Sequence, residues 1–145
     1  MSTIEKRQQQ VDLSDLSAPQ LSEQDWRDLR EGVRLFNEGR FWESHEAWEE
    51  VWKRHQENSR IFLQGLIQAA AALHQLRRYI YHGADKHLRN ALWKLEPFQP
   101  VCLGIDVQGL VQKLSRTHRE LTRLGPAHLQ QFNFDLLPKI IFVQE

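Results

Sequence analysis

Apolar residues near the start of the chain recur at helical spacing and predict a first helix. Trp26, Leu29, Val33 and Phe36 lie three or four residues apart, which places them on one face of an α-helix. Ser22 precedes them and is followed by three polar residues, a pattern typical of a helix N-terminus. We therefore expect a helix from about Ser22 to the residue before Gly39.

A second helix is predicted directly after Gly39. Glycine can adopt the left-handed conformation that closes a helix, and the apolar pattern restarts at once with Phe41, His45, Trp48 and Trp52. The short link between the two patterns indicates that the two helices form an antiparallel hairpin. His45 falls within the core-facing stripe of the second helix and is expected to be at least partly buried.

The stretch from Arg60 to about Tyr81 is apolar on nearly all sides, which is typical of a helix in the middle of a bundle. Its few polar positions include Gln64, Gln68 and Gln75, which share one narrow stripe. Buried amides need hydrogen-bond partners. We therefore expect this stripe to face other polar groups.

The remaining pattern predicts two more helices and a tail. Leucines from Leu88 to Leu95 mark a fourth helix, and Asp106 can cap a fifth that ends at Gly125. Residues 1–20 are polar and predicted to be a poorly ordered arm, 21–125 a helical bundle, and 126–145 an extended tail packed on it. The sequence thus predicts an all-α, single-domain antiparallel bundle of about five helices with an extended C-terminal tail.

Composition limits the functional classes. The 145 residues carry 19 Lys plus Arg and 19 Asp plus Glu, so no net charge draws the whole molecule to nucleic acid or to an anionic membrane. Cys102 is the only cysteine, which excludes an intrachain disulfide and a multi-thiolate zinc site. We see neither a signal peptide nor a transmembrane segment. A cytoplasmic protein that does not bind membranes is expected.

The second helix carries the most concentrated candidate chemistry. The spacing of His45, Glu46 and Glu49 is like the His-Glu-x-x-His zinc motif, with a carboxylate in place of the second histidine. On this hypothesis the protein is a metal-dependent hydrolase in which His45 and Glu49 bind the metal and Glu46 is the general base. His74 or His118 would supply the third ligand.

Two alternatives need no metal. His45 can be a neutral core histidine that donates to Gln64 or Gln68 while the glutamates face solvent. It can also line a small polar pocket between the second and third helices that holds a ligand without chemistry. The candidate pocket consists of Glu43, His45, Glu46, Glu49, Trp52, Gln64, Gln68 and His74. We favour a small binding or scaffold domain with this pocket, to which no catalytic residue, metal or cofactor is assigned.

A second cluster interleaves basic and aromatic residues. It runs from Arg77 to Trp93 and could stack on bases and contact phosphates of a nucleotide or nucleic acid. However, residues 23–50 carry nine acids and four bases, so the basic half has an acidic counterpart in the same chain. Attraction within the fold or between two copies explains the cluster without nucleic acid. We therefore expect a homo-oligomer or a small-molecule ligand rather than a nucleic-acid partner.

Several segments together resemble the domain of unknown function family 309. They are Phe36 to Trp52, Leu63 to His74, Gly83-Ala84 and Gly104 to Asp106, within a resemblance that covers roughly 25–124. The resemblance implies a helical bundle and no activity. It maps a shared cluster onto Glu43, His45, Glu46, Trp52, Gly65 and Gln68. Where such sequences often carry a second histidine and a Gly-Asn turn, this chain has Gln75 and Tyr79-Ile80, which predicts that the central helix runs on further.

Overall fold

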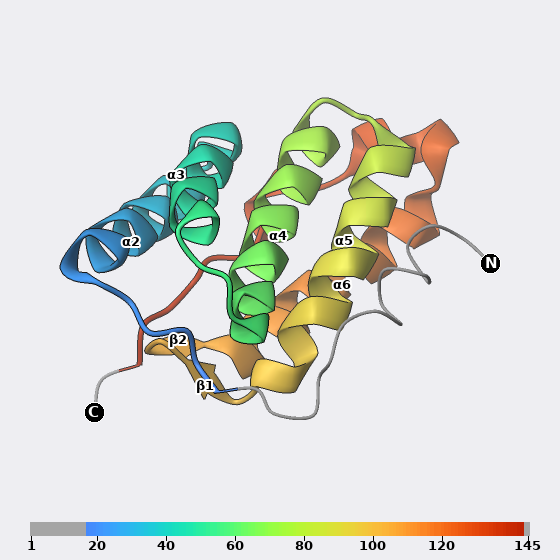
Figure 1. Cartoon of the computed structure of the whole chain (residues 1–145). Coiled ribbons are helices and arrows are strands. Elements are labelled where there is room, and N and C mark those ends of the chain that lie inside the picture. The colour runs from blue at the N-terminus through green and yellow to red at the C-terminus, as the bar shows by residue number, and fades with distance from the viewer. Residues whose placement is uncertain (1–16, 144–145) are drawn as a thin grey trace.

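The computed structural model describes residues 17–143 and shows an all-α bundle (Figure 1). Its five longer helices, among the described residues, are α2 (Glu23–Asn37), α3 (Phe41–Lys53), α4 (Ile61–Arg77), α5 (Tyr81–Leu95) and α6 (Val107–Leu124). The predicted fold class is therefore confirmed. Most of the expected N-terminal arm, residues 1–16, lies outside the described residues.

The α2–α3 hairpin begins with a capping box and packs unusually closely. Ser22 Oγ accepts a hydrogen bond from the Asp25 backbone N–H, and the Asp25 carboxylate accepts one from the Ser22 backbone N–H. Further along, a Cβ added at Gly32 would lie only 2.2 Å from the Trp48 indole nitrogen. Glycine at position 32 therefore lets the indole of Trp48 lie against the α2 backbone, where it donates to Leu29 O at 3.1 Å.

Helix α4 occupies the middle of the bundle, between α3 and α5 (Figure 1). Twelve of its residues are buried, as the apolar sequence predicts. The expectation that this helix extends to about Tyr81 was wrong, because α4 ends at Arg77 and Tyr79 adopts a φ of 58°. Tyr79 thus takes the left-handed turn position that glycine or asparagine usually fills, and α5 starts two residues later.

A small hairpin that the sequence pattern did not predict joins α5 to α6. A 3₁₀ turn, η2 (Glu96–Phe98), leads into β1 (Val101–Cys102), which pairs antiparallel with β2 (Ile105–Asp106). The turn between the strands has positive φ at Leu103 and Gly104. Asp106 then caps α6 as predicted, since its side chain accepts from Gly109 N at 2.9 Å.

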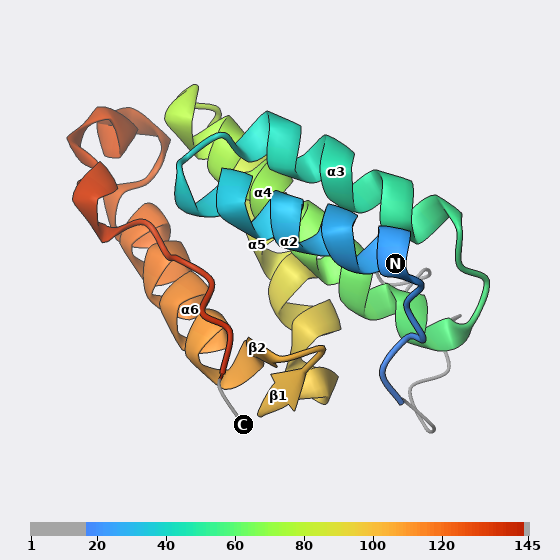
Figure 2. The same cartoon turned by 90° about the vertical axis from the view of Figure 1, so that its left-hand side faces the viewer.

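The C-terminal segment is only partly extended. It contains two 3₁₀ stretches, η3 (Pro126–Gln131) and η4 (Phe134–Leu136), before an extended run to Val143 (Figure 2). The Asn37 side chain holds this run by accepting from Ile140 N at 2.7 Å and donating to Ile140 O at 2.9 Å. Leu129, Phe132 and Ile140 are buried and belong to the core.

Candidate functional site

His45 lies in the middle of α3, where it is largely covered. Its side chain is 15% exposed, and its Nε2 atom lies 3.3 Å from Glu49 Oε1 one turn further along the helix. The ring stacks on Trp42, with centroids 4.8 Å apart and planes inclined by 9°. Trp42 also contacts His74 of α4 at a centroid distance of 5.3 Å. The indole therefore links His45 to the central helix.

Helix α4 carries the glutamine stripe that the sequence indicates. Gln68 and Gln75 are two turns apart and both are half-buried. Gln75 also approaches α5, because a Cβ added at Gly83 would lie 3.2 Å from its Cγ atom. Gln75 therefore lies where α4 meets α5.

Five buried polar atoms on α3, α4 and α5 have no hydrogen-bond partner among the described residues. They are His45 Nδ1, Trp52 Nε1, Gln68 Oε1, Gln75 Oε1 and His87 Nδ1. We refer to these five residues as the polar strip. Buried polar groups in folded proteins are nearly always paired, so a concentration of unpaired ones requires an explanation. The set includes one obligatory donor, two obligatory acceptors and two imidazole nitrogens.

His74 and His87 lie in an environment that disfavours their charged forms. Burial lowers the pKa of His74 below the ordinary histidine value, and electrostatic interactions with Arg78 and His45 lower it further. Burial also lowers the pKa of His87, with smaller electrostatic contributions from residues that include Lys86 and His45. His74 and His87 are therefore neutral at pH 7, and they can take part in neutral hydrogen bonding.

The other predicted pocket residues differ in exposure. Glu43 is exposed and pairs with Arg40, and Glu46 is exposed. Gln64 is half-buried. The Trp52 ring is covered by the guanidinium of Arg60, which lies 4.3 Å from the ring centroid. Sequence reasoning placed Gln75 on the glutamine stripe but left it out of the pocket.

The proposed metal site lacks a third ligand. His45 and Glu49 lie close together, but the His118 ring is engaged elsewhere, with Nε2 2.7 Å from Asp85 Oδ1. Within residues 17–143 no group of three or more His, Cys, Asp or Glu side chains is arranged to hold a metal ion. A catalytic zinc ion usually has three protein ligands, so the residues present do not fit the hydrolase hypothesis.

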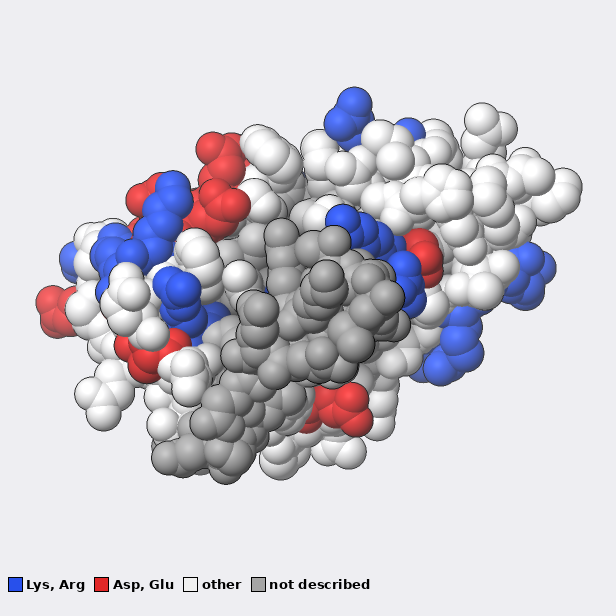
Figure 3. Space-filling view, turned by 45° about the vertical axis from the view of Figure 1, so that its right-hand side comes forward, with Lys and Arg blue, Asp and Glu red and all other residues white. Residues whose placement is uncertain are grey.

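The basic and aromatic cluster is largely engaged within the fold. Arg77 donates to Gly39 O at 2.9 Å and lies over the Phe41 ring, while Arg89 pairs with Asp85 at 3.2 Å. Trp93 packs against the hydrophobic core. On the side shown in Figure 3, basic and acidic side chains are interspersed outside the grey atoms. These contacts favour a structural role for the cluster.

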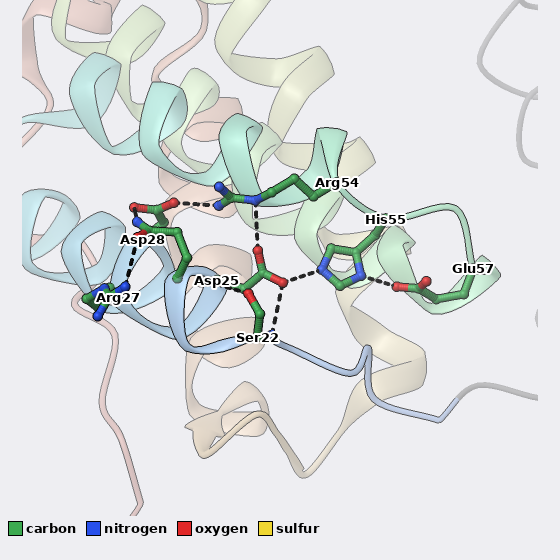
Figure 4. A network of polar contacts seen from close by, with 8 residues as sticks. Ser22, Asp25, Arg27, Asp28, Arg54, His55 and Glu57 are labelled. Atoms are coloured by element: carbon green, nitrogen blue, oxygen red, sulfur yellow. Dashed lines mark hydrogen bonds and ion pairs between the residues drawn. The ribbon is translucent and has the colours of Figure 1, made fainter.

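A second polar cluster, which sequence reasoning missed, joins the start of α2 to the loop after α3 (Figure 4). His55 is 7% exposed, and its Nε2 atom lies 2.8 Å from Asp25 Oδ2 while Nδ1 contacts Glu57. Arg54 Nε lies 2.8 Å from the other oxygen of Asp25, and the same guanidinium pairs with Asp28. We refer to Asp25, Asp28, Arg54, His55 and Glu57 as the charged network.

The carboxylates of the charged network are stabilised in their ionised form. Burial alone would raise the pKa of Asp25, but hydrogen bonds from Ser22 and His55 outweigh it, so this pKa lies below the usual value. Burial alone would also raise the pKa of Glu57. Hydrogen bonds from backbone N–H groups and from His55 outweigh burial, so this pKa is lowered as well. The charged network therefore stabilises the contact between the start of α2 and the loop after α3.

Comparison with known proteins gives a family match over part of the chain and no activity. None of the helices in residues 17–143 combines the length and apolar character needed to span a bilayer. A search among curated proteins finds no match for this chain. The segment that contains α3, α4 and all five residues of the polar strip does match a family model. Residues 29–87 fit the model of the domain of unknown function DUF309, which confirms over these residues the resemblance that the sequence motifs indicate.

Proposed function

We propose that this protein is a small binding domain that holds a polar small molecule against the polar strip. The observation that carries this proposal is the set of five unpaired buried atoms contributed by three neighbouring helices. An unsatisfied buried donor or acceptor costs about 1 to 3 kcal/mol. A ligand that offers both donors and acceptors would recover that free energy when it binds.

The arrangement favours an elongated and uncharged ligand. Gln68 and Gln75 are seven residues apart on α4, which corresponds to about 10 Å along the helix axis. Their unpaired oxygens accept hydrogen bonds, whereas the Trp52 indole can only donate one. The lowered pKa values of His74 and His87 keep these rings neutral and disfavour pairing with an anion. The exposed Trp42 ring, stacked on His45, offers a flat apolar surface at the rim.

Equilibrium dialysis against a metabolite extract, read by mass spectrometry, tests this proposal. The wild-type protein is expected to concentrate one or more small molecules, and the double variant Gln68→Met, Gln75→Met is expected to lose them. Methionine keeps the length of glutamine but removes its hydrogen-bonding groups. Gln108→Met is the matched control, because this glutamine is exposed on α6.

The proposal fails if the wild-type protein concentrates no compound more than the double variant does. In that case buried water molecules, which typically make about three hydrogen bonds each, would be the partners of the strip.

We further infer a cytoplasmic location, because the single cysteine, Cys102, is buried and burial raises its pKa to about 12, as suits an inert thiol in a reducing compartment.

A further inference from the structure

A basic groove runs between α6 and the C-terminal segment, on a different part of the molecule from the polar strip. Two adjoining hollows of about 300 and 440 Å³ share Arg116 and Leu136 in their walls. Leu136 and Ile141 are 55% and 51% exposed, so the rim of the groove is apolar. The groove therefore offers both apolar surface and positive charge to a partner.

The positive charge of this groove is mostly not neutralised within the fold. Its walls carry more basic than acidic side chains: the bases are Lys113, Arg116, Arg119, Arg123 and Lys139, and the acids are Glu120 and Asp135. Arg123 pairs with Glu120, but Arg116 and Arg119 have no ion-pair partner among the described residues. Helix α6 as a whole carries four bases and one acid. A partner that binds in this groove is expected to be acidic.

The outer face of α3 has the complementary character. Trp42 is 51% exposed, and Glu46 and Glu50 follow it at spacings of four residues along the same ridge. Glu46 has no ion-pair partner in the described part of the chain, and Glu50 has only Lys53 at 3.6 Å. The ridge from Trp42 to Glu50 rises about 12 Å, and that from Arg116 to Arg123 about 10 Å. The two ridges therefore match in length and are opposite in charge.

The two faces cannot meet within one molecule. Figure 2 shows α3 and α6 on opposite sides of the bundle, with α2, α4 and α5 between them. The chain has equal numbers of acidic and basic residues, so copies do not repel one another through net charge at neutral pH. We propose that the acidic ridge of α3 in one copy binds the basic groove of α6 in a second copy. Such a head-to-tail contact joins different surfaces and builds an open chain or a closed ring.

Charge reversal tests this contact in the full-length protein. Glu46→Arg with Glu50→Arg, and separately Arg116→Glu with Arg119→Glu, are each expected to weaken self-association at least tenfold in sedimentation velocity at low salt. An equimolar mixture of the two double variants is expected to associate again, because each reversed face then meets a face of opposite charge. Association of the wild-type protein should weaken as salt is raised, since exposed charges are screened.

The matched control for the α6 variant is Arg27→Glu with Lys86→Glu, which lowers the net charge by the same amount at exposed positions of α2 and α5. This variant keeps both faces, so it should still self-associate, weakened only by its net charge. A wild-type protein that is monomeric at all concentrations overturns the proposal and leaves the groove to an acidic segment of another protein. Oligomers that persist in both double variants also overturn it, because another surface then forms them.

Discussion

His45 and His55 lie ten residues apart in the chain and have opposite surroundings. Both ring nitrogens of His55 contact carboxylates, and the pKa values of those carboxyls are lowered. His45 has Glu49 on one side and an unpaired nitrogen on the other. Polar side chains in the charged network are thus matched by the fold itself, whereas those in the polar strip are matched by nothing among the described residues.

This difference separates two uses of buried polarity. The charged network joins the loop after α3 to the first turn of α2. The unpaired atoms of the polar strip form no hydrogen bond within the described structure, so they reduce stability unless another molecule pairs with them. Mutations in the charged network are expected to change stability alone. Mutations in the polar strip are expected to change ligand binding as well.

The largest expected effect comes from breaking the charged network. Asp25→Asn removes the charge that faces both Arg54 and His55, and Asp25 is only 4% exposed. We expect the free energy of unfolding to fall by about 3 kcal/mol, the lower end of the range for a broken buried ion pair. Urea denaturation measures this change.

Asp28→Asn provides the matched control for this prediction. Asp28 pairs with the same guanidinium, but its side chain is 27% exposed, so its loss is expected to cost less than about 1 kcal/mol. Equal losses in the two variants would show that the buried position of Asp25 contributes nothing special.

A smaller effect of opposite sign is expected in the polar strip. Gln68→Met and Gln75→Met each remove a buried oxygen that has no partner, while the methionine side chain packs well among apolar residues. Each is expected to raise the free energy of unfolding by about 1 kcal/mol in ligand-free protein. Differential scanning calorimetry would detect this as a higher melting temperature. A loss of stability comparable to that of Asp25→Asn would show that the fold itself pairs these amides.

The pH dependence of stability should also separate the two clusters, with smaller changes at each step. His74 and His87 have lowered pKa values when folded, so the unfolded chain takes up protons first as pH falls below about 6.5, and stability declines from there. Asp25 and Glu57 also have lowered values, so their contribution is complete above about pH 4 and is lost below it.

Urea denaturation between pH 3 and pH 8 measures both steps. Asp25→Asn should reduce the decline below pH 4. The assignment would be wrong if this variant left the decline below pH 4 unchanged.

Helical periodicity predicted the longer helices because each buries one face, or in α4 nearly all faces, in a regular pattern. The end of α4 was misplaced because Tyr79 adopts a left-handed conformation that sequence alone assigns to glycine or asparagine. The β1–β2 hairpin was missed because strands of two residues are too short to show alternation. Local pattern therefore predicts long elements better than the turns between them.

The candidate site was predictable only in part, for a related reason. His45 and Glu49 lie one turn apart on a single helix, so their proximity follows from helix geometry. Asp25 and His55 are thirty residues apart, and their contact depends on how the α2–α3 hairpin closes. His87 belongs to the polar strip only because α5 packs on α4, and its neighbours in the sequence had indicated a basic surface instead.

The tryptophans give the molecule separate optical reporters for these regions. Trp48 is fully buried against α2 and should emit at short wavelength until the whole bundle unfolds. Trp52 belongs to the polar strip, and the half-exposed Trp42 stacks on His45 of the strip, so the emission of both should respond to an occupant while that of Trp48 does not. Replacing Trp42 and Trp52 by phenylalanine, one at a time, would therefore assign a fluorescence change on titration to either end of the strip without any added label.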